Sequence, residues 1–291
     1  FRLHQAEALI TEILGQVSLV ALFLVLLTYV LFPRLRNLPG INTMNLTFAL
    51  LVAESIFSHG IDAKLPWLCT AIAVCLHYLF LAAHFWMNVM SYDVYRTFVS
   101  DVSGSVSMKR VKDKKKYVPL YSLYAWGTPL LIVAFCVFVD RSDLFPDITI
   151  GYGLSYCWIT QPLAAFISFG APILIIFIAN CIFFARVITT ISRTARLSKT
   201  RLQTQTSSSS LNNRQPGRAD AWLYLRMSSV MGFTWIFGLS SSIVSSFSRP
   251  AFEICVISHT LGILFTIFNI SQGIFIFGAF VCNRRVLNLY R

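Results

Sequence analysis

The chain has 291 residues, of which 56% are hydrophobic and only 12% are charged, with a formal net charge of +12. So few charged side chains do not cover the surface of a soluble domain of this length, and the composition predicts a membrane protein. The Lys and Arg residues fall in short groups between apolar runs and not on one soluble face, which excludes a nucleic-acid-binding protein.

Seven apolar runs are long enough to cross a bilayer, which takes about 20 mostly apolar residues each. In chain order they are Leu9–Phe32, Ile41–Gly60, Trp67–Val94, Tyr117–Val139, Ile159–Val187, Ala221–Phe247 and Phe252–Cys282. They predict an all-α membrane protein in which residues 1–282 form a seven-transmembrane helix bundle. Residues 283–291 mix basic and apolar side chains, and predict a short amphipathic C-terminal helix along the membrane surface.

Basic residues are divided unequally between the two ends of these spans. Four of the 24 Lys and Arg residues, Arg2, Lys64, Arg141 and Arg249, lie at one end, and the others lie at the opposite end. Because basic residues are enriched in cytoplasmic loops, we expect a multi-pass plasma-membrane protein with an extracellular N-terminus and a cytoplasmic C-terminus. No pattern typical of a cleavable signal peptide precedes the first span, and we expect an ectodomain to be absent from this chain.

Two cysteines lie at the predicted outer ends of spans. Cys69 is near the start of the third span, and Cys157 directly precedes the fifth. The outer compartment is oxidising, so a disulfide between them would persist and would attach the loop to the third span. The alternative is a pair of buried thiols.

Polar side chains inside a membrane are costly and therefore informative. Glu54, His77 and His259 suit a ligand pocket or a packing role equally well, whereas Asn88 and Asn180 favour hydrogen bonds between helices. The histidines of the spans form no i, i+4 pair, so neither a metal site nor a cofactor is expected. No nucleophile–base arrangement is present in the sequence, and enzymatic activity is not expected.

Four motifs, in order along the chain, resemble those of one receptor class. They are Cys69 in span three, Cys157-Trp158 in the outer loop, Gly232-Phe233-Thr234-Trp235-Ile236-Phe237-Gly238 in span six and Asn269-Ile270-Ser271-Gln272-Gly273 in span seven. Together they resemble the secretin/adhesion class (class B) of G-protein-coupled receptors. The stretch from Phe85 to Phe98, FWMNVMSYDVYRTF, is most similar to the Methuselah-like receptors.

The resemblance implies a receptor that converts an extracellular peptide or tethered agonist into activation of a heterotrimeric G protein at the cytoplasmic face. Phe1–Leu3 are too few residues to identify the end of such a tethered peptide. The alternative is a polytopic transporter or channel, which would align charged residues through the midplane, whereas these spans hold few acids and no buried Lys. A retinal photoreceptor needs a Lys in its last span, and Phe252–Cys282 contains none.

The resemblance also implies roles for individual residues. A ligand pocket and switch would use Trp158, Trp86, Trp235, Phe233, Phe237, Gly238, His77, His259 and Gln272. We expect helix bends at Pro172, Gly232 and Gly273, and a two-state packing change at Trp235. The G-protein face would include Arg34, Arg36, Asp93, Arg96, Arg186 and Arg226, while other basic residues bind anionic membrane lipid.

In one respect the chain departs from the class. Its members usually carry a His low in span two and a Glu low in span three, which lock the inactive inner face. Thr43 and Met90 occupy those positions here. We expect Asp93, one turn further toward the cytoplasm, and Arg96 to form a substitute lock.

Overall fold

A computed structural model of the chain describes residues 2–100, 116–142, 149–204 and 252–290. Within these ranges six helical stretches are long and apolar enough to cross a membrane, which confirms the all-α membrane class. They are Leu9–Leu31, Leu38–Gly60, Pro66–Phe98, Lys116–Arg141, Pro162–Thr190 and His259–Phe280. The remaining predicted span, Ala221–Phe247, lies outside the described residues.

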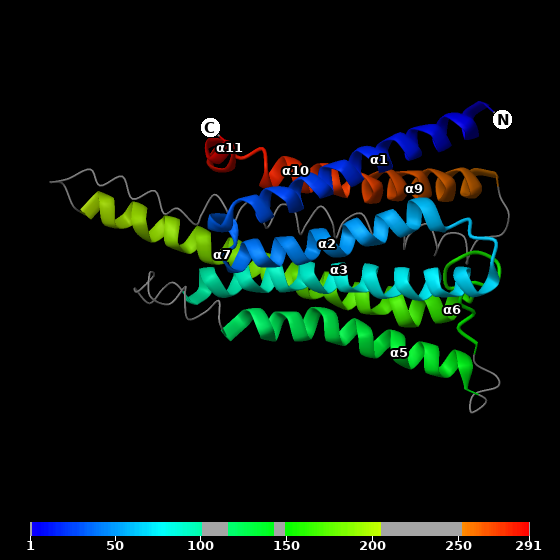
Figure 1. Cartoon of the computed structure of the whole chain (residues 1–291). Coiled ribbons are helices and arrows are strands. Elements are labelled where there is room, and N and C mark those ends of the chain that lie inside the picture. Colours follow the sequence, from blue (N-terminus) through cyan, green and yellow to red (C-terminus); the bar gives the residue numbers. More distant parts are fainter. Residues whose placement is uncertain (1, 101–115, 143–148, 205–251, 291) are drawn as a thin grey trace.

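The helices lie side by side in a bundle (Figure 1). In chain order they are α1 (Arg2–Leu31), α2 (Leu38–Gly60), α3 (Pro66–Ser100), α5 (Thr128–Arg141), α6 (Pro162–Ala165), α7 (Ala171–Thr204), α9 (Phe252–Ile270), α10 (Gln272–Phe280) and α11 (Arg284–Tyr290). Several boundaries differ from the prediction by a few residues, and the last helix of the fifth span, α7, continues past Val187 to Thr204. Helix α3 continues past Val94 to Ser100, and the fifth helix begins at Pro162 because Ile159 is paired with Tyr152 in an extended loop.

Helix α3 is the central element of the bundle and contacts α2, α5 and α7. All residues from 81 to 91 are buried, and the side chain of Trp86 is fully enclosed. This helix therefore places Cys69 and His77 toward one end of the bundle, and Asp93 and Arg96 toward the other.

Two of the described spanning helices contain a five-residue π-helical segment just before a proline. Leu123–Gly127 precedes Pro129, and Phe166–Gly170 precedes Pro172. Proline has no N–H, and its ring crowds the carbonyl four residues earlier. A wider π turn moves that carbonyl away from the ring. The helix is therefore locally irregular before Pro172, as the π segment Phe166–Gly170.

The last spanning helix is interrupted at Ser271, between α9 and α10. Two residues later, the N–H of Gly273 donates to the Ser18 hydroxyl of α1 at 3.0 Å, and that hydroxyl donates to the Glu54 carboxylate of α2 at 3.1 Å. A Cβ on Gly273 would lie 2.5 Å from the Ser18 carbonyl oxygen. Glu54 thus takes part in a contact that joins three helices.

Replacing Gly273 by Ala is expected to lower the free energy of unfolding by about 1 to 3 kcal/mol, the usual cost of overpacking, because α1 and α10 must separate. Thermal unfolding of the purified protein in detergent measures the effect. Gly278→Ala on the same helix is the matched control, since a Cβ there meets no atom of the described residues within 4 Å. Equal melting temperatures for the two variants would contradict the close α1–α10 contact.

Candidate functional site

Candidate functional residues lie toward both ends of the bundle. We call the end that holds Cys69 and Cys157 the disulfide end, and the end that holds Arg34, Arg36 and Arg96 the basic end. In Figure 1 the disulfide end is on the right, where α1 begins, and the basic end is on the left.

At the disulfide end, the loop from residue 149 to 161 is attached to α3. Cys69 and Cys157 are joined with an S–S distance of 2.05 Å, which confirms the predicted disulfide. One oxygen of the Asp140 carboxylate accepts from the backbone N–H groups of Ile150 and Gly151, at 2.9 and 2.8 Å. Gly153 has a φ of 72°, and a Cβ there would lie 2.7 Å from the backbone nitrogen of Thr70. The loop is therefore held close against the start of α3.

His77 of α3 connects this loop to the fifth helix. Its Nε2 lies 3.2 Å from the Ser168 carbonyl oxygen, and its Nδ1 lies 2.7 Å from the Tyr152 hydroxyl. A carbonyl only accepts, so Nε2 carries the proton, and in the neutral ring Nδ1 accepts from Tyr152. Burial raises the pKa of Tyr152, which keeps this hydroxyl protonated.

The Ser168 carbonyl is available to His77 for a reason that lies in the sequence. In an α-helix this carbonyl would accept from the N–H four residues on, but that residue is Pro172. His77 provides a donor in its place. The proline, the π segment Phe166–Gly170 and His77 therefore form one structural unit.

Aromatic rings surround His77. Trp158 of the loop and Phe169 of the π segment have ring centroids 6.4 and 5.8 Å from that of the imidazole, and lie 5.1 Å from each other in an edge-to-face arrangement. Phe80 packs against Trp158 at 6.1 Å. The structure thus brings together two of the predicted pocket residues, His77 and Trp158.

Other predicted pocket residues lie elsewhere. His259 is exposed on α9, Gln272 donates to Asn269 beside the interruption at Ser271, and Trp86 packs edge-on against Trp126 at 6.2 Å. Six predicted site residues lie outside the described part of the chain: Arg226, Gly232, Phe233, Trp235, Phe237 and Gly238.

Halfway along the bundle, two sets of polar contacts join four helices: α2, α3, the fourth spanning helix and α7. Asn88 donates to Asn180 of α7 at 2.9 Å and accepts from the Tyr124 hydroxyl at 2.9 Å. The indole of Trp126 donates to Asn45 of α2 at 3.2 Å. These groups satisfy one another, as expected for polar side chains that pack helices within a membrane.

At the basic end, Asp93 is the centre of a second polar cluster. Its Oδ1 lies 3.2 Å from Arg96 and accepts from the Tyr121 hydroxyl at 3.1 Å, and the Asp93 residue is only 4% exposed. The Arg96 guanidinium lies 3.7 Å from the centroid of the Tyr117 ring, a cation–π distance. Tyr117 and Tyr121 lie one turn apart at the start of the fourth span, and neither is among the site residues predicted from the sequence.

The other arginines of the predicted G-protein face differ in their surroundings. Arg36 donates to the carbonyls of Tyr29 and Val30, and so satisfies main-chain groups near the end of α1. Arg34 and Arg186 are exposed. Near Arg36, the Tyr290 hydroxyl lies 2.7 Å from the Thr28 hydroxyl, which attaches α11 to α1.

Comparisons with known proteins agree over nearly the whole chain. The profile of "7 transmembrane receptor (Secretin family)" matches residues 5–276. The chain is 29% identical to "G-protein coupled receptor Mth2" of Drosophila simulans and 28% identical to "Probable G-protein coupled receptor Mth-like 10" of Drosophila melanogaster. Each match covers 98% of this chain, and 52% and 49% of these relatives respectively.

A similar match comes from a vertebrate protein. The chain is 28% identical to "Adhesion G protein-coupled receptor L4" of Danio rerio, over 97% of this chain and 34% of that protein. The chain therefore spans about half the length of the two Drosophila relatives and about a third of the fish protein.

Replacing His77 by Phe is expected to lower the free energy of unfolding by about 1 to 3 kcal/mol, because the buried Ser168 carbonyl and Tyr152 hydroxyl each lose a partner. In a Pro172→Ala background His77→Phe should cost less stability. The alanine at this position has a backbone N–H that can donate to the Ser168 carbonyl. Denaturation in detergent of the wild type, the two single variants and the double variant completes the double-mutant cycle. The same cost in both backgrounds would show that His77 and Pro172 are not coupled.

Proposed function

Since its sequence matches the family profile over residues 5–276, the chain belongs to the secretin family of seven-transmembrane receptors, and we propose that it transmits an extracellular signal to a heterotrimeric G protein. The profile match over nearly the whole chain carries this proposal. A transporter or channel is not favoured, because the matching relatives are named as G-protein-coupled receptors.

The proposed topology places the disulfide end outside the cell and the basic end in the cytoplasm of a plasma-membrane receptor. Two independent features support it. A disulfide such as Cys69–Cys157 persists in an oxidising compartment, and the basic residues are concentrated at the opposite end, as in cytoplasmic loops.

The proposed agonist is an extracellular peptide, either free or tethered. Trp158 and Tyr152 lie in the loop at the disulfide end and contact His77, which in turn contacts Ser168. A ligand that moves this loop would act directly on the joint between α3 and the fifth helix. For any such ligand, the shift toward an active state depends on binding that state more tightly.

The proposed lock of the inactive state is the cluster of Asp93, Arg96 and Tyr121. Thr43, at one of the positions where the class usually carries its lock, donates to the Pro39 carbonyl of its own helix, and Met90 has no charge. Asp93 instead links α3 to the fourth helix through Tyr121. Opening this cluster would free the end of α3, at the basic end that also holds the exposed Arg34, for a G protein.

Signalling in cells tests the proposed function. The chain, the Trp235→Ala variant and an empty vector are compared at matched surface expression for cAMP, calcium and G-protein dissociation. We expect a basal signal above the empty vector, reduced by Trp235→Ala if span six is the switch. Absence of coupling to every G-protein class, with and without added N-terminal peptides, would contradict the receptor function.

Replacing Asp93 by Ala is expected to raise basal G-protein dissociation about fivefold to tenfold. Removing a contact worth about 1 to 1.5 kcal/mol from the inactive state changes the active fraction by this factor. Tyr121→Phe should give a smaller rise. Tyr95→Phe is the control, because it removes a hydroxyl from a ring that stacks on Phe183 and leaves Asp93 untouched. A silent Asp93→Ala variant would exclude this lock.

A further inference from the structure

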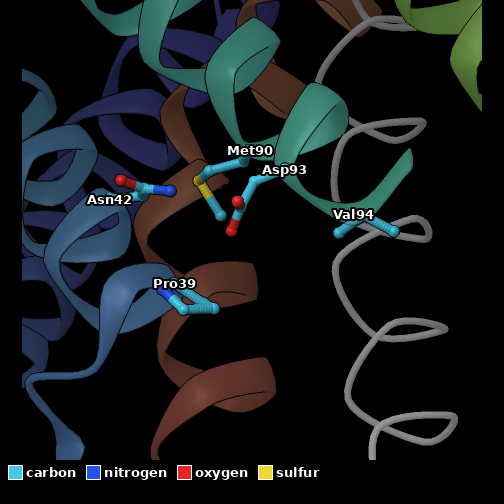
Figure 2. Close-up of a pocket in the computed structure, with 5 residues that line it drawn as sticks. All are labelled: Pro39, Asn42, Met90, Asp93 and Val94. Atoms are coloured by element: carbon cyan, nitrogen blue, oxygen red, sulfur yellow. The ribbon is translucent and has the colours of Figure 1, made fainter. Parts of the chain in front are cut away.

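A small cavity lies between α2 and α3 at the basic end. Its lining residues are Pro39 and Asn42 from the first turns of α2, and Met90, Asp93 and Val94 from the last part of α3 (Figure 2). The cavity has room for little more than a water molecule. A larger occupant can enter only after the groups around the cavity have moved.

Asn42 is the unusual residue of this cavity. It is 1% exposed, and neither its amide nitrogen nor its amide oxygen has a hydrogen-bond partner among the residues that the structure describes. Figure 2 shows its amide nitrogen turned toward Met90 and Asp93. By contrast, Asn45, one turn later on α2, donates to the Ile41 carbonyl and accepts from the Trp126 indole.

An unpartnered amide in this position is unfavourable for the closed bundle, because its groups have left water without gaining a replacement bond. The same groups would bind a ligand that offers both a donor and an acceptor. Asn42 therefore has hydrogen-bonding capacity that the described part of the closed bundle does not use.

The surroundings of Asn42 restrict the chemistry of that ligand. The Asp93 carboxylate is paired with Arg96 and bonded by Tyr121, so the local charges are balanced. A free anion would approach Asp93, and a free cation would compete with Arg96, so a neutral group fits best. Pro39, Met90 and Val94 form apolar walls. A main-chain peptide group flanked by apolar side chains matches this combination.

We propose that Asn42 is a binding residue for the main chain of the intracellular protein partner, which it reaches when the bundle opens at the basic end. This inference rests on the proposed function, because it assigns a contact for the G protein. A partner that bonds Asn42 only in the open arrangement stabilises that arrangement by the same bonds.

The test compares Asn42→Leu with the wild-type chain, both purified in detergent. Leu has the same branching and number of side-chain heavy atoms as Asn but no polar atoms, and the cavity leaves room for its larger methyl groups, so the melting temperature of the receptor alone should stay the same or rise. In a nucleotide-exchange assay with a panel of purified heterotrimeric G proteins, the G-protein concentration for half-maximal exchange should increase about fivefold to tenfold.

Thr47→Val is the matched control. Thr47 is also on α2 and fully buried, and its hydroxyl has no partner within the described ranges, but it does not line the cavity. The Thr47→Val variant should therefore have a melting temperature like that of Asn42→Leu, and should promote nucleotide exchange as well as the wild type does. If Asn42→Leu does not fold, Asn42→Ala replaces it, with the same expected loss of exchange.

The outcomes separate the two proposals. A wild-type chain that promotes no exchange on any G protein overturns the proposed function, and this contact with it. Normal exchange by the wild type and an equal result for Asn42→Leu overturns only the contact. If Asn42→Leu loses exchange and also has a lower melting temperature, Asn42 has a packing role and the contact is overturned. The same holds if Thr47→Val loses exchange as well.

Discussion

The bundle depends on one constraint: within a membrane, each main-chain N–H and C=O group must find its partner inside the protein. At two irregular points of the described helices, a side chain from another helix meets this need. His77 donates to the Ser168 carbonyl before Pro172, and Ser18 accepts from Gly273 after the interruption at Ser271. At these two points, the irregularity of one helix therefore provides a contact with another.

This constraint explains how the two ends of the bundle are related. His77 and Asp93 are 16 residues apart on α3, about 24 Å at 1.5 Å per residue, and the stretch between them is almost entirely buried. Such a helix moves as a unit and does not deform gradually. The fifth helix is different, because its π segment holds one extra residue in a turn. Conversion of that turn to an α turn would rotate the remainder of the helix by about 100°, including Asn180, which bonds Asn88.

Much of this arrangement could be predicted from the sequence, but not all of it. Apolar length identified the six spans that the described residues contain, and the location of Cys69 and Cys157 at the outer ends of spans favoured the disulfide that the structure shows. Asp93 and Arg96 are i, i+3 neighbours on one helix and so meet without knowledge of the fold. Tyr121 bonds Asp93 from another helix, and Ser18 meets Gly273 across 255 positions. Such contacts depend on how helices pack, which hydropathy does not determine. The Gly-x-Pro sequences at 127–129 and 170–172 were visible signals of the π segments.

The two asparagines of α2 show how a closed bundle differs from one prepared for a partner. Asn45 faces Trp126, and both polar ends of its amide are bonded within the protein, so it stabilises the arrangement in which it is seen. Asn42, three residues earlier and more deeply buried, has neither end bonded by any described residue. An apolar side chain of the same shape would stabilise this arrangement more than Asn42 does, so in our proposal Asn42 reduces the energy difference between it and a bundle opened at the basic end. The proposed lock at Asp93, which lines the same cavity, would act in the opposite direction. In these two proposals, the balance between the neighbouring groups would set how readily the basic end opens for a G protein.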